Sequence, residues 1–325
     1  MTRRRVLIFE AIHPAALAWL RERAEVAFAP DLREEAILPL VVAVDGIVIR
    51  ANGRVTDRLL AHAPRLRVVG RHGVGLDNVD LDACARRGIW VVYTPLANVE
   101  AVAEHAVGLM LAVAKRIVEG DRAVRAGEFA AARHRLVGQE LHGQTLGIAG
   151  FGRIGQRVAE ICRAAFAMPV MFADLLSHEE VAARLRAQRV PLDELLARSD
   201  VISLHLPLTP QTRHLIDGPA LARMKPGAIL INTARGAVVD ETALLAALRD
   251  GRLAAGLDVF ADEPLPPGNP LPMLPNVVLT PHCASHTEGA LLAMAMVVED
   301  VVRVLHGEAP RYPANTPSPT AKRRG

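Results

Sequence analysis

The fold is decided by the stretch QTLGIAGFGRIG, residues 144–155. Its first half is an apolar run suited to a buried parallel strand, and it ends in Gly150, Gly152 and Gly155, which have GxGxxG spacing. In such a turn the first glycine permits a tight bend, the second lets a pyrophosphate approach the backbone, and the third lets the next helix pack closely on the strand. The stretch therefore predicts a dinucleotide-binding turn with phosphates at the helix N-terminus.

A second strand and an acidic residue follow at the distance that this prediction requires. Residues 169–173 are apolar, and Asp174 follows them, nineteen residues past Gly155. A carboxylate there accepts hydrogen bonds from both ribose hydroxyls of NAD and repels the 2′-phosphate of NADP. A structural turn and a solvated aspartate are the ordinary alternatives, but the combined spacing favours an NAD site.

The composition describes a globular chain with room for two domains. It has 325 residues, of which 51% are hydrophobic. The 38 Lys and Arg residues nearly balance the 35 Asp and Glu residues and are interspersed with them, so we expect no nucleic-acid partner. Cysteines occur only at Cys84, Cys162 and Cys283, too few and too scattered for a disulfide framework or a zinc site, and we expect no metal.

No targeting or membrane-spanning segment is predicted. The basic N-terminus runs into an apolar stretch, residues 6–9, that is too short for the core of a signal peptide. The longest apolar stretch, residues 106–114, is shorter than a membrane-spanning helix. We therefore expect a cytoplasmic protein without a membrane partner.

Short apolar runs alternate with amphipathic segments along most of the chain. The first part contains predicted strands at 6–9, 46–49, 66–69 and 89–92, with helices near 14–23, 56–62 and 80–87. The second part contains predicted strands at 146–149, 169–173, 201–205, 228–231, 254–258 and 277–279. Such alternation predicts two α/β units, each with a parallel sheet. The last residues, 313–325, lack apolar content, and we expect them to be disordered.

Between the two units, residues 99–125 form one long helical pattern that is apolar on several faces. A helix of this kind must be buried broadly. Burial between domains and burial against a second copy of the chain would both satisfy it. We expect a homodimer formed around this helix.

Three segments at predicted strand ends carry side chains suited to proton and hydride chemistry. Arg235, in INTARG, follows a strand, where a guanidinium can hold a carboxylate or keto oxygen. Asp262 and Glu263 lie near the end of the next strand, in DVFADEP. His282, in TPHCAS, follows the last strand and can exchange a proton near neutral pH. Each has an ordinary structural explanation alone, but together on one rim they favour an active site.

Cys283 follows His282 directly and suggests a nucleophile. Covalent chemistry would need a base arranged on the thiol, and His282 already suits another role. We therefore assign no nucleophilic function to Cys283.

These segments together resemble the NAD-dependent D-2-hydroxyacid dehydrogenase family. The glycine-rich turn, HLPLTPQT, MKPG leading to INTARG, GLDVF with Glu263, and Pro281 with His282 occur in the family's order and spacing. The resemblance implies an α/β fold in which a Rossmann NAD domain, residues 99–284, is inserted into a flavodoxin-like substrate domain formed by residues 1–98 and 285–325. It also implies an active site in the cleft between the domains.

The resemblance assigns a catalytic set of Arg235, Glu263 and His282. In the reducing direction His282 would protonate the keto oxygen while NADH delivers hydride to the same carbon. Arg235 would orient the substrate, and Glu263 would hold the imidazole and stabilise its charged form. The implied substrate-binding residues are Arg50, Val74, Gly75, Asn98, Arg235 and His282. The implied cofactor-binding residues are Gly150, Gly152, Arg153, Ile154, Gly155, Asp174, His205, Pro207, Thr212, Thr233, Ala234, Asp258 and His282.

The substrate is expected to be a small polar 2-hydroxy acid or 2-keto acid. Only 3% of residues are aromatic, and potential anion contacts are numerous at Arg50, Arg54, Arg71, His72 and Arg235. Hydroxypyruvate, glyoxylate and 3-phosphoglycerate fit this description. A non-enzymatic NAD-sensing co-repressor and a phosphite or formate dehydrogenase are the alternatives, although formate enzymes usually carry Gln where Glu263 stands.

Overall fold

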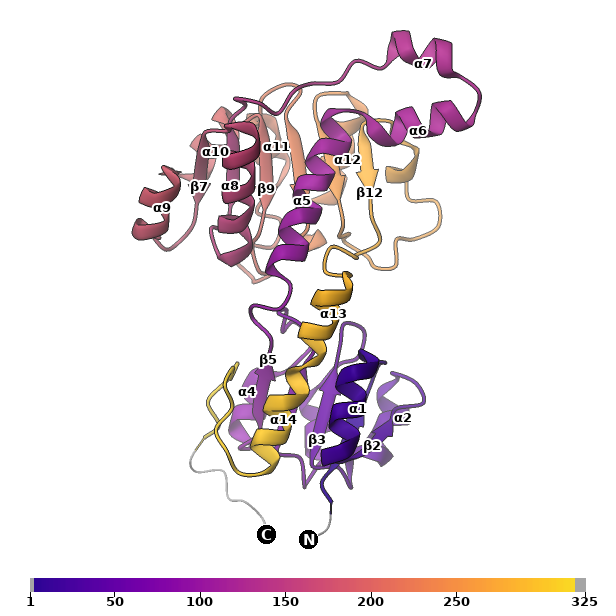
Figure 1. Ribbon diagram of the computed structural model, residues 1–325, viewed down its shortest axis with the longest axis vertical. Helices are drawn as coiled ribbons and strands as arrows, with labels where there is room; N and C mark the ends of the chain where they lie inside the picture. Colours follow the sequence, from indigo (N-terminus) through magenta and orange to yellow (C-terminus); the bar gives the residue numbers. More distant parts are fainter. Residues whose placement is uncertain (1–2, 319–325) are drawn as a thin grey trace. The chain divides into compact units, whose positions relative to one another are not determined.

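The computed structural model describes residues 3–318 of the chain. The chain divides into two compact units, one made of Met1–Asn98 with His286–Gly325 and the other of Val99–Ser285 (Figure 1). The chain therefore leaves the first unit, builds the whole of the second, and returns to the first.

The first unit contains a sheet of five parallel strands. They are β1 (Arg5–Ile8), β2 (Glu25–Phe28), β3 (Gly46–Ile49), β4 (Val68–Arg71) and β5 (Trp90–Tyr93). Their order across the sheet is β2-β1-β3-β4-β5, with neighbours in parallel register. This is the flavodoxin-like order, as expected.

Helices cover both faces of this sheet. One face packs against α2 (Glu34–Val41), α3 (Asp57–Ala61) and α4 (Leu81–Arg86). The other packs against α1 (Pro14–Arg23), the end of α13 (Glu288–Ala295) and α14 (Val297–Leu305). Burial on both faces explains why the central strands are continuous apolar runs without polar alternation.

The second unit contains a sheet of seven parallel strands. They are β6 (Leu146–Ala149), β7 (Val170–Ala173), β8 (Gln188–Arg189), β9 (Val201–Leu204), β10 (Ile229–Asn232), β11 (Ala254–Leu257) and β12 (Val277–Leu279). The order is β12-β11-β10-β9-β6-β7-β8. It reverses direction between β6 and β9, and ligands of open α/β sheets bind outside the carboxyl ends of the strands at such a point.

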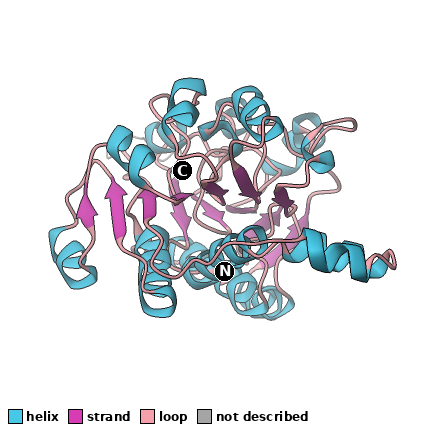
Figure 2. Cartoon of the chain, turned by 90° about the horizontal axis from the view of Figure 1, so that it is seen from above, coloured by secondary structure: helices cyan, strands magenta, loops and turns pink. Residues whose placement is uncertain are grey.

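Helices also cover both faces of the second sheet (Figure 2). One face carries α5 (Val99–Ala114), α8 (Arg153–Phe166) and α9 (Glu179–Leu185). The other carries α10 (Leu192–Arg198), α11 (Gly218–Arg223) and α12 (Glu241–Arg249). Two short 3-10 helices, η1 (Gly236–Val238) and η2 (Leu271–Met273), lie in the loops. Two further helices, α6 (Ile117–Arg125) and α7 (Phe129–Arg135), project from this unit as an arm (Figure 1).

The expected pair of parallel α/β sheets is confirmed, but the single helix over residues 99–125 is wrong. Helix α5 ends at Ala114, Arg116 adopts a left-handed conformation with φ of 52°, and α6 starts at Ile117. A left-handed residue ends regular helical hydrogen bonding, so the chain changes direction there. Apolar periodicity alone carried no signal of this break.

The expected disorder of residues 313–325 is also wrong for the part that the structure describes. Pro313 forms a bridge with Val92, and the side chain of Asn315 accepts from Val91 N at 2.8 Å and donates to Ile89 O at 3.0 Å. This short polar segment is ordered because its polar groups satisfy the edge of β5. Residues 319–325 lie outside the described part.

Among the described residues, no helix is both long and apolar enough to cross a membrane.

Candidate active site

The glycine-rich turn joins β6 to α8 and has the shape that a dinucleotide requires. Gly150 has φ of +91°, and a Cβ there would lie 2.6 Å from the carbonyl oxygen of His205. A Cβ at Gly155 would collide with the carbonyl oxygen of Gly150, so α8 packs directly on the turn. A Cβ at Gly152, in contrast, would meet no neighbouring atom within 4 Å. The turn is thus tight where helix and strand meet and open where a pyrophosphate would approach.

The N-terminus of α8 is available to an anion. Its N-cap residue, Gly152, makes no side-chain capping hydrogen bond, and the helix starts at Arg153. The first backbone N–H groups of a helix have no partner inside the helix, and they carry partial positive charge. Together with Ile154, these residues fit the phosphate-binding part of a nicotinamide dinucleotide site.

Asp174 lies beside this turn. Its Oδ2 accepts a hydrogen bond from Phe151 N at 2.6 Å, and its Oδ1 accepts one from Leu176 N at 2.9 Å. The carboxylate is therefore fixed in place while each oxygen keeps a further lone pair. That geometry fits a group that receives ribose hydroxyls.

A short contact between two candidate catalytic residues joins the loop after β11 to the loop after β12. Nδ1 of His282 lies 2.6 Å from Oε2 of Glu263, whose Oε1 accepts from Phe260 N at 3.0 Å. Burial raises the pKa of Glu263, but hydrogen bonds from His282 and Phe260 N, with the charges of His282 and Arg235, outweigh burial and leave this pKa below its usual value. The carboxylate is held in its ionised form.

The other ring nitrogen of His282 points away from this contact. Within the described residues, Nε2 makes no hydrogen bond, and the side chain is 45% exposed. Because the anionic Glu263 accepts only, Nδ1 carries a proton and Nε2 is the atom that can exchange one with a ligand.

Arg235 follows β10, the strand next to β11. Asn232 fixes its backbone, because the amide nitrogen of Asn232 donates to Arg235 O at 2.9 Å while its Oδ1 accepts from Ala234 N at 3.0 Å. The charge of Arg235 helps to lower the pKa of Glu263, so guanidinium and carboxylate are electrostatic neighbours. The three predicted catalytic residues thus follow three adjacent strands of one sheet.

The chain matches a known protein family. The model for the NAD-binding domain of D-isomer specific 2-hydroxyacid dehydrogenases matches residues 107–284. A glyoxylate reductase from Aeropyrum pernix is 43% identical over 320 residues, covering 95% of this chain and 95% of the relative. The chain belongs to the D-2-hydroxyacid dehydrogenase family. This is a family of NAD-dependent oxidoreductases, as the sequence motifs implied.

Other members of the family show how far the similarity extends. A D-3-phosphoglycerate dehydrogenase from Methanocaldococcus jannaschii is 41% identical over 317 residues, and the match covers 97% of this chain but 60% of that relative. Among solved structures, the TT0316 protein from Thermus thermophilus has a TM-score of 0.88 at 42% identity, covering 95% of this chain and 99% of that one. A D-mandelate dehydrogenase from Rhodotorula graminis has a TM-score of 0.89 at 28% identity, with coverage of 97% and 98%.

Two predicted cofactor-binding residues differ in how their polar atoms are satisfied. Oγ1 of Thr233 is buried and has no hydrogen-bond partner among the described residues, which is expected of a group that awaits a ligand. His205, by contrast, hydrogen-bonds through Nε2 to Ser203 Oγ at 2.9 Å. Burial lowers the pKa of His205 to about 4, so the ring is neutral near pH 7.

The HLPLTPQT segment, residues 205–212, is held by hydrogen bonds between its own residues. The hydroxyl of Thr212 donates to Pro207 O at 2.7 Å, and Thr209 N donates back to that hydroxyl oxygen at 2.8 Å. These contacts fix the loop that follows β9, beside the glycine-rich turn. In this structure Pro207 and Thr212 therefore shape the loop.

The predicted substrate loop lies in the first unit, after β4. Gly73 has φ of +118° and donates its N–H to the Thr94 hydroxyl at 3.1 Å. The N–H groups of Val74 and Gly75 make no hydrogen bond within the described residues, which suits an anion nest. The buried Oδ1 of Asn98 likewise has no partner there.

Two arginine side chains of this unit donate hydrogen bonds to nearby backbone carbonyl oxygens. Arg50 donates from Nη1 to Ala11 O at 2.7 Å, and Arg71 donates to His72 O. Arg54 is exposed. Burial, followed by the charges of Arg50 and Arg71, lowers the pKa of His72 to about 4, so His72 is neutral near pH 7 and contributes no charge to anion binding.

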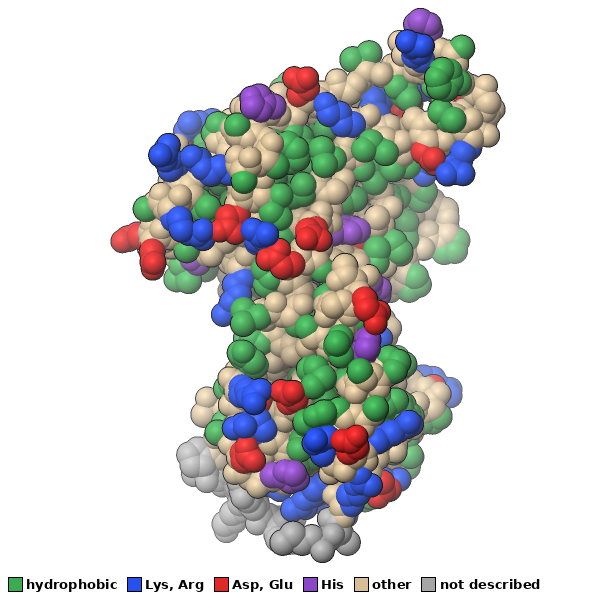
Figure 3. Space-filling model, viewed as in Figure 1, with side chains coloured by type: hydrophobic (Ala, Val, Ile, Leu, Met, Phe, Trp, Pro, Cys, Tyr) green, Lys and Arg blue, Asp and Glu red, His purple; other side chains and the backbone are tan. Residues whose placement is uncertain are grey.

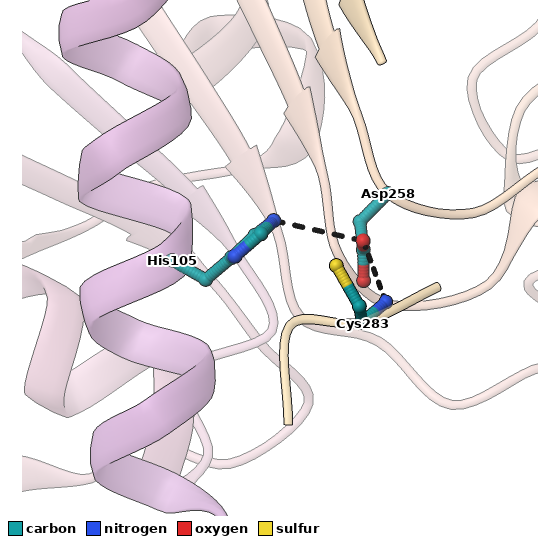
Figure 4. Close-up of side chains that lie close together, drawn as sticks. All are labelled: His105, Asp258 and Cys283. Carbon is teal, nitrogen blue, oxygen red and sulfur yellow. Dashed lines mark hydrogen bonds and ion pairs between the residues drawn. The ribbon is translucent and has the colours of Figure 1, made fainter. Parts of the chain in front are cut away.

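One residue outside the predicted site, His105, contacts this machinery. His105 on α5 lies 2.9 Å through Nε2 from the hydroxyl of Thr280, and Thr280 donates to Asp258 at 2.6 Å (Figure 4 shows His105 and Asp258). Asp258 was predicted to bind the cofactor. A histidine inside a long apolar helix is the signal that could have drawn attention to His105.

Proposed function

We propose that the protein transfers a hydride between NAD(H) and a small D-2-hydroxy acid or the matching 2-keto acid. The observation that carries this proposal is the 2.6 Å contact between His282 and Glu263, which leaves Nε2 of His282 available on the exposed side. An acid–base group that is held by a second charged residue, at the same sheet edge as a dinucleotide-binding turn, suits carbonyl reduction.

In the reducing direction His282 gives the proton on Nε2 to the keto oxygen. NADH, when bound, supplies the hydride to the same carbon. Glu263 keeps the imidazole oriented and stabilises its positive charge until the proton leaves. In the oxidising direction neutral His282 takes the hydroxyl proton.

Arg235 holds the substrate in this scheme. A guanidinium can donate two parallel hydrogen bonds to a carboxylate or bind the keto oxygen, and its position after β10 is fixed by Asn232. We propose that the backbone N–H groups of Val74 and Gly75, with Arg50 and Asn98 of the same unit, also receive the substrate carboxylate.

We propose NAD over NADP as the cofactor. Asp174 is fixed by Phe151 N and Leu176 N, so its negative charge stands beside the turn that would hold the adenosine ribose. Relatives vary in this respect: one neighbour is a glyoxylate/hydroxypyruvate reductase from Sinorhizobium meliloti in complex with NADP. That protein shares 31% identity with the chain.

Glyoxylate or hydroxypyruvate is the favoured substrate. The relatives named glyoxylate reductase include that of Aeropyrum pernix, which is 43% identical over 320 residues. In addition, Arg50 and Arg71 each engage a backbone carbonyl of the first unit. A phosphate would have to compete for these donors.

3-Phosphoglycerate is the second candidate. Arg54 is exposed and belongs to the same unit, and a phosphoglycerate dehydrogenase from Mycobacterium tuberculosis is 44% identical over 305 residues. An exposed arginine can make a charge-assisted contact with a phosphate.

A substrate panel separates these possibilities. Purified protein is assayed with NADH and glyoxylate, hydroxypyruvate or phenylpyruvate, and with NAD and 3-phosphoglycerate. We expect the highest kcat/KM with glyoxylate or hydroxypyruvate. Preferred oxidation of 3-phosphoglycerate, lost in Arg54→Ala, would select the second candidate, and no turnover of any acid would favour a non-enzymatic NAD-sensing role.

We also propose that the protein forms a homodimer through the arm of α6 and α7. Helix α5, which motivated this expectation, is already buried inside its own unit, against α8 and the sheet. Large apolar side chains are instead exposed along the arm and the segment after it, and Figure 3 shows hydrophobic side chains at its surface (upper right). They are Ile117, Val124, Phe129 and Val137.

A groove beside the arm has the matching character. It runs between the end of α5, the start of α6 and the loop before β12, and its apolar lining includes Val113, Val118 and Met273. The side chain of Met273 is 83% exposed. A two-fold pairing in which each arm covers the other copy would bury both surfaces.

A further inference from the structure

Asp258 is the anchor of the loop that carries His282. Its side chain is completely buried, so its negative charge requires compensation by donors. Among the described residues, its hydrogen-bond donors come from residues 280–284: the hydroxyl of Thr280 at 2.6 Å, Cys283 N at 2.9 Å and Ala284 N at 2.9 Å. Nε2 of His105 lies 3.6 Å from Oδ1, in ion-pair range but beyond a hydrogen bond. Hydrogen bonds to a charged acceptor are stronger than those between neutral groups. The loop is therefore wrapped around one carboxylate.

His282 owes its backbone conformation to the same anchor. Its N–H donates to the backbone oxygen of Asp258 at 2.8 Å, and its φ is 49°, in the left-handed region that residues other than glycine rarely adopt. A left-handed conformation is unfavourable for a residue with a side chain, and the surrounding hydrogen bonds must offset that cost. The direction of the imidazole toward Glu263 thus depends on the wrapping of residues 280–284.

His105 connects this anchor to α5. Thr280 has a single hydroxyl proton, and that proton goes to Asp258. The hydroxyl oxygen can then only accept from Nε2 of His105, 2.9 Å away, so this nitrogen carries a proton. The ring of His105 makes no other hydrogen bond within the described residues. The resulting chain of donors runs from His105 to Thr280 to Asp258.

A metal ion is an alternative explanation for the cluster in Figure 4, because ligand atoms of His105, Asp258 and Cys283 all lie within 4.8 Å of one another. The chemistry of the donors argues against it. Asp258 already accepts from three groups of the loop, and burial, with the nearby charge of Asp258, raises the pKa of the Cys283 thiol. A protonated thiol is a poor metal ligand.

We propose that His105 is a positioning residue for the acid–base reaction, acting through Thr280 and Asp258 to hold His282 in its productive orientation. This inference rests on the proposed role of His282. Hydrogen bonds in such a chain polarise one another, so the removal of His105 weakens the hydrogen bond from Thr280 to the carboxylate of Asp258.

Matched substitutions test the chain. His105→Leu removes the donor, whereas His105→Gln keeps an N–H at similar reach; Thr280→Val removes the hydroxyl, whereas Thr280→Ser keeps it. We expect His105→Leu and Thr280→Val to lower kcat for glyoxylate reduction by ~5- to 20-fold, since misorientation by a small distance costs rate more than binding. The Kd of NADH, measured by calorimetry, should change less than about threefold. His105→Gln and Thr280→Ser should stay within about threefold of wild type in kcat.

The double variant His105→Leu/Thr280→Val provides the decisive comparison. If both residues act through one chain, the double variant loses no more kcat than Thr280→Val alone. Three results would overturn the proposal. The loss of kcat in the double variant could equal the product of the two single losses, His105→Leu could keep the kcat of wild type, or His105→Gln could lose as much kcat as His105→Leu. His142→Leu, at an exposed histidine of the same unit, controls for general effects.

Two further assays keep the alternatives apart. His282→Ala is measured in parallel: if it retains full turnover, the proposed function itself fails, whereas an inactive His282→Ala beside a fully active His105→Leu removes only the present inference. Wild type and Cys283→Ser are also assayed with added Zn²⁺ and with a chelator. An activity change that depends on Cys283 would replace the hydrogen-bond chain by a metal site, and equal responses support the chain.

Discussion

Nδ1 of His282 lies 2.6 Å from Oε2 of Glu263, and this contact decides which ring nitrogen meets the substrate. The ionised carboxylate can only accept a hydrogen bond, so Nδ1 carries a proton. The proton that is exchanged with the substrate is therefore the one on Nε2. The hydrogen bond and the charge of His282 both help to lower the pKa of Glu263, so the carboxylate stays ionised beside the ring. The pH dependence of the reaction should therefore report on this pair.

The first prediction concerns Glu263→Gln. Reduction of a keto acid needs protonated His282, so its rate falls as pH rises, and oxidation of the hydroxy acid falls as pH drops. Without the carboxylate, positive charge on the ring loses its partner at 2.6 Å, so the falling limb of reduction should move to lower pH, with kcat at pH 7 reduced ~10- to 100-fold. Steady-state rates from pH 5 to pH 9 measure this.

Asp262→Asn is the matched control, because it neutralises the neighbouring acidic residue. Its pH profile should follow that of wild type. A limb that stays in place in Glu263→Gln, or that moves equally in both variants, would contradict the pairing of His282 with Glu263.

The parts of this site that were predictable are those fixed by short stretches of sequence. Gly150, Gly152 and Gly155 belong to one turn. Arg235 and His282 each lie three residues past the end of an apolar strand, so local pattern places them at the edge of a sheet. His105 belongs to a helix far away in sequence, and only packing brings it to Thr280. A pattern that contains one histidine among apolar residues carries no information about that distant hydroxyl.

The fold shows the same division. The buried strands β1, β3 and β6 have continuous apolar runs and were predictable, whereas β2 is half exposed and β8 has just Gln188–Arg189, so neither has a strong pattern. The break between α5 and α6 depends on the backbone conformation of Arg116, which composition does not specify.

The second prediction concerns cofactor choice at Asp174. A 2′-phosphate placed beside this carboxylate should cost on the order of 2–4 kcal/mol through repulsion and unpaired donors. Wild type should therefore prefer NADH over NADPH by ~30-fold or more in kcat/KM. Asp174→Ala should reduce that ratio at least ~10-fold by weakening NADH and admitting NADPH.

A control for this variant is Asp193→Ala, at an exposed acidic residue of the same unit. It should leave the cofactor ratio unchanged. Equal kcat/KM for NADH and NADPH in the wild-type protein would refute the role of Asp174.

The third prediction concerns stability and pH in the first unit. The pKa of His72 is lowered from 6.5 to about 4 by burial and by the charges of Arg50 and Arg71. Between these values the unfolded chain binds a proton that the folded chain does not, so stability is complete above pH 6.5 and is lost as pH falls toward 4. The loss attributable to His72 should reach about 3 kcal/mol.

Urea denaturation at several pH values tests this prediction. Both tryptophans, Trp19 and Trp90, belong to the first unit, so their fluorescence follows that unit alone. His72→Leu should show a shallower decline of unfolding free energy between pH 7 and pH 4, while His306→Gln, at an exposed histidine of the same unit, should follow wild type. If the unfolding free energy of all three proteins declines in parallel, the pH dependence comes from groups other than His72.

The fourth prediction concerns the arm of α6 and α7 in the proposed homodimer. Phe129 is 61% exposed at the start of α7, and an apolar side chain of that size gains about 2 kcal/mol when it is removed from water. Phe129→Glu would place a charge in each of two symmetry-related contacts. We expect wild type to be a dimer at micromolar concentration by light scattering and Phe129→Glu to be monomeric or at least ~100-fold weaker in association.

Leu175→Glu, at a residue that is 97% exposed but far along the chain from the arm, should remain dimeric. A monomeric wild-type protein would rule out the dimer, and a dimer that persists in Phe129→Glu while Leu175→Glu dissociates would move the interface from the arm to the surface that follows β7.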